Sequence, residues 1–345
     1  MILLVIAASV LAALAPTVLY TLLVWWADRH EREPLPLLLA VFFWGAVPAT
    51  AVALILEGSG QTLPQVSEGI YRGAILSSAL GVPIIEEVVK AVALLAVVTW
   101  AAREFDGVLD GIVYGAVVGF GFAMTENIFY FIGAYGEQGW SWWAAVVGLR
   151  AVIFGFNHAV FTACTGIGFG LAVLSPRRGW RWLFPLLGLA AAILLHGLHN
   201  LGAELSSVSI VPFLVGTLAD WGGFWLLALI IILTWDQERR WIRVELADEV
   251  GVLLRPEEYE AILTFSARAV RRLAILPFWR SSAPQRTALF QHRLVDLAFV
   301  KARLRRLATS ETNQANALRG RADQLRAQIA ALRPDTAPLT PPVDT

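Results

Sequence analysis

Long apolar runs constrain this chain more than any other feature of its sequence. A helix that crosses the hydrocarbon core of a bilayer needs about 20 mostly apolar residues. Seven stretches meet this requirement, separated by short polar connectors: Ile2–Ala27, Pro36–Leu56, Gly73–Ala101, Val108–Ala134, Trp142–Leu174, Trp182–Ala203 and Val208–Trp235. Charged residues make up only 16% of the chain, whereas soluble domains carry about 25%. The sequence therefore predicts an all-α, polytopic membrane helix bundle of about seven transmembrane helices.

A change in charge divides the chain near Trp235. Residues 1–235 carry 9 basic and 14 acidic side chains, a balance of −5, and residues 236–333 carry 18 and 11, a balance of +7. The basic region has helical patterns near Pro256–Ile275, Arg286–Leu307 and Thr312–Leu332. Residues 334–345 are rich in proline, a composition typical of disorder. We expect a transmembrane bundle over 1–235, a cytoplasmic helical region over 236–333 and a disordered tail over 334–345.

The arginines in the connectors predict how the bundle is oriented. Cytoplasmic connectors of membrane proteins are enriched in lysine and arginine. The first, third and fifth connectors carry six arginines, against one in the second, fourth and sixth. This places the N-terminus outside a bacterial-type plasma membrane and the basic region in the cytoplasm. There it would rest on anionic lipid, and no motif in it indicates binding of nucleic acid.

Several predicted spans contain ionisable or amide side chains close to mid-membrane depth. A charge at that depth costs at least ~2.5–3.5 kcal/mol, so it is interpreted as functional by default. The residues concerned lie in the third to sixth spans: Glu86, Glu87, Lys90, Glu126, Asn127, Arg150, His158, His196, His199 and Asn200. The first, second and seventh spans are expected to have nothing comparable near their centres. At a rise of about 1.5 Å per residue, the four polar sets fall into one slab, and we expect them to converge.

Spacing along the helices supports this convergence. Glu86 and Lys90 are four residues apart, with the acid first, which favours an ion pair on one helix face. Arg150 is interpreted as a structural partner for one of the acids. Glycines at four-residue spacing in the fourth span favour close helix packing, which would bring Glu126 near the third span; they are Gly111, Gly115 and Gly119.

The combination of residue types allows three functions. Paired carboxylates, a third carboxylate and histidines in a dry setting are the groups that activate water in a hydrolase. The same groups would serve an ion- or proton-coupled transporter, although the chain has no evident inverted repeat and its polar groups share one depth. A non-catalytic membrane scaffold is the third alternative. Each residue taken singly also admits a structural role, as a buried ion pair or a hydrogen-bonded histidine.

Four segments of the chain resemble the PrsW family of intramembrane proteases, relatives of the CAAX-processing and bacteriocin-processing membrane proteases. The segments are Pro83–Lys90 (PIIEEVVK), Phe122–Asn127 (FAMTEN), His158–Thr162 (HAVFT) and His196–Asn200 (HGLHN). They are similar to the family's EExxK, FxxxE, histidine and HxxxN motifs, and the resemblance covers roughly residues 29 to 205. At His199 the sequence departs from the pattern, in which we expect an aromatic residue.

The resemblance implies a membrane endopeptidase that cleaves a membrane-anchored protein, such as an anti-sigma factor. Glu86 and Glu87 would activate the water, Asn200 would donate to the developing oxyanion, and the site would be completed by Glu126, His158 and His196. The family has been classed with metallopeptidases, whereas its relatives resemble glutamate-dependent enzymes, so the need for a metal stays open. Catalytic zinc takes three protein ligands, and although HExxH is absent, the candidates are Glu126, His158, His196 and His199.

Overall fold

The structure is a computed structural model, and it describes residues 1–28, 33–60, 75–175, 177–263, 282–307 and 313–333. Within these ranges the chain forms helices and no strand, apart from an isolated bridge between Val250 and Leu254. The predicted all-α fold is confirmed. The chain divides into two compact units, which are Met1–Asp28 with Arg32–Ile231, and Arg29–Glu31 with Ile232–Thr345.

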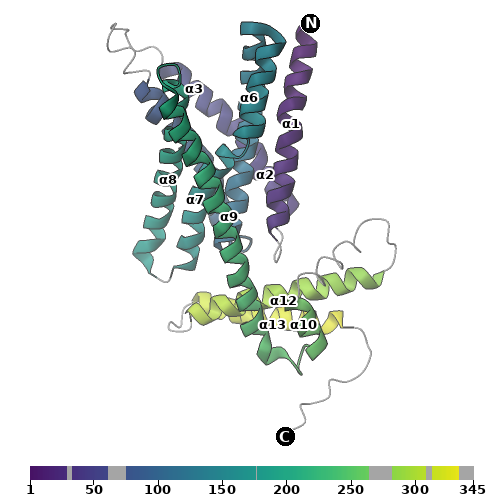
Figure 1. The fold of residues 1–345 in the computed structure, drawn as a ribbon. Coiled ribbons are helices and arrows are strands. Elements are labelled where there is room, and N and C mark those ends of the chain that lie inside the picture. Colours follow the sequence, from purple (N-terminus) through teal and green to yellow (C-terminus); the bar gives the residue numbers. More distant parts are fainter. Residues whose placement is uncertain (29–32, 61–74, 176, 264–281, 308–312, 334–345) are drawn as a thin grey trace. The chain divides into compact units, whose positions relative to one another are not determined.

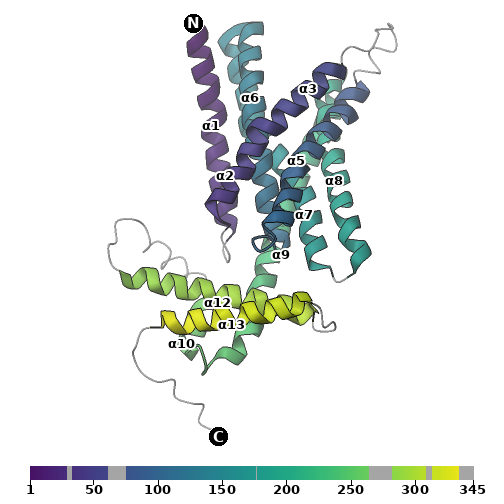
Figure 2. The same cartoon turned by 180° about the vertical axis from the view of Figure 1, so that it is seen from behind.

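The first unit is a bundle of helices that stand side by side (Figures 1 and 2). Its elements are α1 (Ile2–Ala27), α2 (Leu35–Trp44), η1 (Gly45–Ala49), α3 (Thr50–Gly60), η2 (Ser77–Gly81), α5 (Val82–Trp100), α6 (Val108–Val147), η3 (Gly148–Ile153), α7 (Asn157–Leu174), α8 (Arg178–Leu205) and the first part of α9 (Ile210–Leu246). The outward faces of these helices carry leucine, isoleucine, valine and tryptophan. Such faces suit lipid, which solvates them as well as a protein core does.

Five described stretches are long and apolar enough to cross a membrane: Ile2–Ala27, Leu35–Glu57, Val108–Leu174, Arg178–Leu205 and Ile210–Glu249. The third of these spans 67 residues and contains a kink, because Gln138 and Gly139 leave helical geometry. Gly139 has φ +73°, a backbone conformation that glycine adopts without steric cost. The polytopic membrane character is thus confirmed, and the number of seven spans stays a prediction.

The fifth predicted span, Trp142–Leu174, was wrong as a continuous helix. Helical geometry runs through η3 to Ile153, stops, and begins again as α7 at Asn157. His158 is therefore the second residue of a helix and does not lie at the middle of one. The first turn of a helix leaves N–H groups without intrahelical partners. Such a break is tolerated at membrane depth only where protein surrounds it or where it lines a cavity.

Three π-helical turns lie beside residues of the predicted site. A π turn shifts carbonyl groups out of the regular ladder and is frequent at functional sites. In η1, the carbonyl of Ala46 accepts a hydrogen bond from the Thr125 hydroxyl at 2.6 Å. In η2, the carbonyl of Ser78 accepts one from Asn200 Nδ2 at 3.0 Å. The third turn, η3, contains Arg150 itself.

Helices α6 and α7 pack with their backbones in close approach. A Cβ atom added to Gly115 would lie 2.7 Å from the carbonyl oxygen of Thr162, and one added to Gly119 would lie 2.8 Å from Cα of Ala159. Neither neighbour can move without shifting its helix. The expected close packing is confirmed, and the helix that these glycines contact is α7. Glu126 reaches the third span through this helix, since His158 of α7 contacts both Glu126 and Lys90.

The second unit has a hydrophobic core of its own. It is formed by the end of α9 with η4 (Ala247–Glu249), α10 (Pro256–Leu263), α12 (Ser282–Leu307) and α13 (Asn313–Leu332). Leu246, Leu294 and Leu325 are fully buried in this core. Beside it the buried carboxylate of Glu249 accepts hydrogen bonds from Lys301 at 2.9 Å and Arg326 at 2.7 Å.

Two of the helices expected in this region are present as α12 and α13. The third, near Pro256–Ile275, is observed as α10 as far as Leu263, and its remainder lies outside the described residues. The predicted disordered tail, residues 334–345, also lies outside them. The division of the chain at Trp235 and the cytoplasmic location of this region stay predictions.

Gly119→Ala should lower the thermal unfolding midpoint of the protein in detergent. The added methyl group would meet the backbone of α7 at 2.8 Å, and overpacking of this kind typically costs about 1–3 kcal/mol. Gly133→Ala is a matched control, because it lies on the same helix and its Cβ would meet nothing within 4 Å. Circular dichroism against temperature compares the two variants. Equal midpoints would contradict the close α6–α7 contact.

Candidate active site

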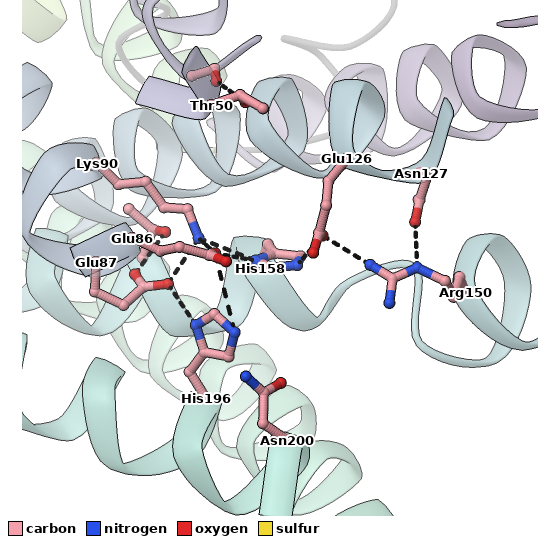
Figure 3. Close-up of polar contacts among 12 residues, drawn as sticks. Thr50, Glu86, Glu87, Lys90, Glu126, Asn127, Arg150, His158, His196 and Asn200 are labelled. Carbon is pink, nitrogen blue, oxygen red and sulfur yellow. Dashed lines mark hydrogen bonds and ion pairs between the residues drawn. The ribbon is translucent and has the colours of Figure 1, made fainter. Parts of the chain in front are cut away.

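Helix α5 brings together two carboxylates and one ammonium group. Lys90 Nζ donates to Glu86 Oε2 at 2.9 Å and to Glu87 Oε1 at 2.8 Å. All three side chains are buried, and Lys90 is 0% exposed. The expected ion pair between Glu86 and Lys90 is present, and Glu87 joins it (Figure 3). Removing one cation and two acids from water costs free energy, and their mutual attraction offsets this cost only when further hydrogen bonds satisfy the remaining polar atoms.

Helices α7 and α8 supply those further bonds to Glu87. His196 Nδ1 lies 3.1 Å from Glu87 Oε1, and the Thr162 hydroxyl donates to Glu87 Oε2 at 3.0 Å. A carboxylate only accepts, so the His196 proton sits on Nδ1 and Nε2 carries the lone pair. The ring of Phe161 stacks on His196, with centroids 4.9 Å apart. Glu87 is thus held from both oxygens, and His196 is fixed in one orientation.

His158 connects the ammonium group to the third carboxylate. Its Nδ1 lies 3.0 Å from Lys90 Nζ, and its Nε2 lies 2.9 Å from Glu126 Oε2 (Figure 3). Lysine has donors and no acceptor, so Nδ1 accepts, and the proton of the neutral imidazole is on Nε2, where it is donated to Glu126. The break before α7 allows this contact, because it places His158 on the first turn of the helix.

Glu126 is held on its other side by Arg150. The guanidinium donates to Glu126 Oε2 at 2.7 Å and to Asn127 Oδ1 at 2.8 Å, and it lies over the ring of Tyr130 at 3.7 Å. Arg150 therefore has the acid partner that the sequence predicts. A continuous polar chain now runs from Glu87 through Lys90, His158 and Glu126 to Arg150.

The structure brings most of the predicted site residues together. Glu86, Glu87, Glu126, His158 and His196 form one cluster, to which four separate helices contribute (Figure 3). Asn200 lies beside His196, and its amide donates to the backbone of η2. His199 does not join the cluster. Its Nδ1 lies 2.7 Å from Asp220 Oδ2 and 3.0 Å from Asn157 Nδ2.

Asp220 corrects our expectation that the seventh span has no polar residue near its centre. It lies on α9 and is 4% exposed. The signal was present in the sequence, since one acidic residue interrupts an apolar run between Val208 and Trp235. It went unrecognised because the four-motif resemblance ends before this helix.

Glu57 is a second carboxylate that the sequence interpretation missed. It lies on α3, and its charge interacts with those of Glu126 and Lys90. Among the described residues, no hydrogen bond reaches its buried Oε1. The sequence signal was weak, because Glu57 follows the last apolar residue of the second predicted span and resembles an ordinary polar flank.

Four of the clustered side chains could hold a metal ion. They are Glu86, Glu87, His158 and His196, and one ligand atom from each lies within 4.8 Å of all the others. Carboxylates and imidazoles are the usual ligands of catalytic zinc, so the donor set fits. Lys90 contacts three of these side chains, so an ion would displace its ammonium group. Glu126 and His199, which we expected as candidate ligands, lie outside this set of four.

An apolar helix bundle encloses this cluster, an arrangement found in membrane-embedded hydrolases and in transporters. The sequence model described as "PrsW family intramembrane metalloprotease" matches residues 33–235, which is more than half of the chain and includes every residue of the cluster. The protein therefore belongs to the PrsW family.

Curated relatives agree with this family. Protease PrsW of Bacillus subtilis (strain 168) is 28% identical over 232 residues, which cover 66% of this chain and 91% of that protein. Protease PrsW of Geobacillus kaustophilus (strain HTA426) is 31% identical over 194 residues, which cover 55% of this chain and 76% of that protein. No solved structure matches the chain. The protein is thus a membrane-embedded protease of bacterial type.

Thr162→Val should slow peptide cleavage about tenfold. The substitution keeps the shape of the side chain and removes the hydroxyl that donates to Glu87, and a hydrogen bond to a charged group contributes about 1.5–3 kcal/mol. Thr165→Val is the matched control on the same helix, because the Thr165 hydroxyl is buried and no hydrogen bond reaches it among the described residues. Single-turnover rates compare the variants. An equal effect of both substitutions would count against a positioning role for Thr162.

Proposed function

We propose that this protein cleaves a membrane-anchored protein within or next to the bilayer, using water activated by a glutamate. The observation that carries the proposal is the cluster itself: two carboxylates and two imidazoles meet inside an apolar bundle, with their ligand atoms within 4.8 Å of one another. The family supports proteolysis. It does not favour the transporter alternative, which uses the same residue types.

The two glutamates have different surroundings, which suggests different roles. Lys90, His196 and Thr162 all donate to Glu87, and a carboxylate whose lone pairs are occupied is a weak base. Glu86 receives Lys90 on Oε2, and no hydrogen bond reaches its Oε1 among the described residues. Glu86 is therefore the general base, and Glu87 holds Lys90 and His196 in place.

Peptide hydrolysis then follows from the positions of these groups. Glu86 takes a proton from water as the water oxygen attacks the scissile carbonyl carbon. The second N–H of Asn200 stabilises the oxyanion. His196 presents Nε2 at 4.0 Å from Glu86 Oε2, a separation that requires one bridging water. Through that water the proton passes from Glu86 to His196, which delivers it to the leaving nitrogen. The C–N bond breaks, the carbonyl side gains the hydroxyl group and the amine gains the proton.

His158 and Glu126 complete the site on the other side of Lys90. Glu126 fixes the His158 proton on Nε2, and Arg150 fixes Glu126. Glu86, Glu87, His158 and His196 would also hold a zinc ion, which when bound polarises the scissile carbonyl and acidifies water.

The substrate class and the orientation of the chain in the membrane are part of the same proposal. The substrate is a protein with a single membrane span, such as an anti-sigma factor, as the resemblance of the motifs implies. The N-terminus lies outside and the basic region after Trp235 lies in the cytoplasm, next to anionic lipid. The charge of the connectors supports this orientation, and the positive balance of residues 236–333 supports the lipid contact.

Glu86→Gln should abolish cleavage and leave the folded protein in the membrane. Glutamine keeps the volume of the side chain but cannot take a proton, and the loss of a general base costs about a hundredfold or more. Purified wild-type protein in detergent, without an ion gradient, is incubated with a library of single-span membrane proteins, and cuts are mapped by mass spectrometry. Cleavage by the variant at the wild-type rate would refute the mechanism. Activity only as gradient-driven flux in sealed vesicles would favour the transporter.

The two histidines of α8 should differ in their effect on the chemical step. His196→Gln should lower the single-turnover rate at least about a hundredfold, because His196 contacts Glu87 and faces Glu86. His199→Gln should lower it far less, because His199 contacts Asp220 on α9. The reverse order would show that the motif is aligned one turn out of place. Equal and total losses that zinc partly restores would favour a metal site with both histidines as ligands.

A further inference from the structure

A second polar pair lies inside the bundle, outside the cluster that carries the chemistry. His199 on α8 and Asp220 on α9 approach to 2.7 Å between Nδ1 and Oδ2, and Asn157 at the start of α7 lies 3.0 Å from the same nitrogen. Asp220 is 4% exposed. The pair thus joins three helices at one point.

The backbone is shaped to allow this contact. A Cβ atom on Gly202 of α8 would lie 2.8 Å from the carbonyl oxygen of Pro212, and one on Gly216 of α9 would lie 3.2 Å from that of Leu198. These glycines let α8 and α9 approach closely directly beside His199. Small residues of this kind are the usual means by which membrane helices meet.

Stability alone gives little reason for this pair. A carboxylate buried at membrane depth is costly even when it is paired. The cost of burying Asp220 is offset at only one of its two oxygens, because no hydrogen bond reaches its Oδ1 among the described residues. Apolar side chains would join the two helices at lower cost. Polar groups kept at such a position call for a functional explanation.

The contact with Asp220 leaves one atom of His199 free to bind. The carboxylate only accepts, so the imidazole proton is on Nδ1 and Nε2 is an acceptor. This is the way in which a carboxylate fixes the tautomer of a histidine. Nδ1 then donates to Asp220, and the Asn157 amide nitrogen is a neighbour of this atom without donating to it. No hydrogen bond to Nε2 occurs among the described residues, and 20% of the His199 side chain is exposed. An oriented acceptor is therefore available on a side chain that is partly exposed.

That acceptor lies at the margin of the active site. His199 follows His196 by about one helical turn, and the ring of Phe161 is close to both, with centroid distances of 4.9 Å to His196 and 6.2 Å to His199. Asn157, the neighbour of His199 on α7, directly precedes His158. The pair therefore flanks the reacting groups without touching them.

A membrane protease has a particular need for acceptors at this place. The carbonyl carbon of a helical substrate is shielded, so the helix must unwind around the bond that is cut. Unwinding in a bilayer exposes backbone N–H groups, which are costly when left unpaired. Both oxygens of Glu87 are occupied by Lys90, His196 and Thr162, and Glu86 is the base that takes the proton of the water. His199 Nε2 is a free acceptor beside them.

We propose that His199, oriented by Asp220, binds a backbone N–H of the unwound substrate segment next to the scissile bond. This inference rests on the proposed function, since it requires a membrane-spanning substrate. His199 is then a substrate-binding residue, and Asp220 is a positioning residue. Binding of this kind changes KM and leaves the chemical step to Glu86 and His196.

The test uses single-span peptides copied from a sequence that the wild-type protein cuts in the library. One backbone amide at a time, within about four residues of the cut, is replaced by an ester, which removes the N–H and keeps the chain geometry. For the wild type, one ester position should raise KM about tenfold, as expected for one hydrogen bond, with kcat changed less than about twofold. In His199→Phe/Asp220→Leu, which leaves no unpaired charge, that position should no longer matter.

The control and the contrary outcomes separate this inference from the function on which it rests. Thr217→Val on α9 should keep the wild-type ester pattern, because the Thr217 hydroxyl bonds within its own helix to Phe213. A wild type whose KM is insensitive to every ester overturns the inference, even if the double variant does not fold. An ester effect that persists undiminished in the double variant also overturns it. A wild type that cuts no peptide refutes the proposed function and this inference with it.

Discussion

The ammonium group of Lys90 is the interaction on which the rest of the bundle depends. It donates to Glu86, Glu87 and His158 at 2.8–3.0 Å. The two acids and the lysine are buried, and His158 is nearly so. Two adjacent carboxylates could not both stay ionised there without the ammonium group, since like charges and desolvation both oppose them. Lys90 lies one turn after Glu86, where its ammonium group can contact both acids. Without this contact the two carboxylates could not stay buried and ionised, and α5 could not pack as it does.

The neighbouring helices are arranged to reach this cation and its acids. Helix α7 begins at membrane depth, so that His158 bridges Lys90 and Glu126. Helix α6 approaches α7 through glycines, since a Cβ on Gly119 would meet Ala159 at 2.8 Å. The π turns expose carbonyl groups that Thr125 and Asn200 use. Irregular backbone thus occurs where polar side chains converge, as expected in a bilayer.

Much of this could be predicted from the sequence, because ionisable residues within apolar runs are rare and expensive. Their common depth predicted that Glu87, Glu126, His158 and His196 would meet, and the i,i+4 spacing predicted the ion pair of Lys90. The interruption before α7 could not be predicted, because the hydrophobic run continues through it without a proline. The partner of the α6 glycines was also hidden, since small-residue spacing marks a close contact but does not name the other helix. Asp220 could have been found from the sequence, since it is the one acidic residue inside the apolar run between Val208 and Trp235.

The central claim is that Lys90 holds the two carboxylates in the bundle, and the stability of Lys90→Met tests it most directly. The measurement is the free energy of unfolding in detergent for this variant and for the triple variant Lys90→Met/Glu86→Gln/Glu87→Gln. Removing one partner of a buried ion pair costs about 3–5 kcal/mol, so the single variant should be much less stable than the wild type. The triple variant leaves no buried charge unpaired in this cluster and should regain most of the loss. A single variant as stable as the wild type would contradict the account.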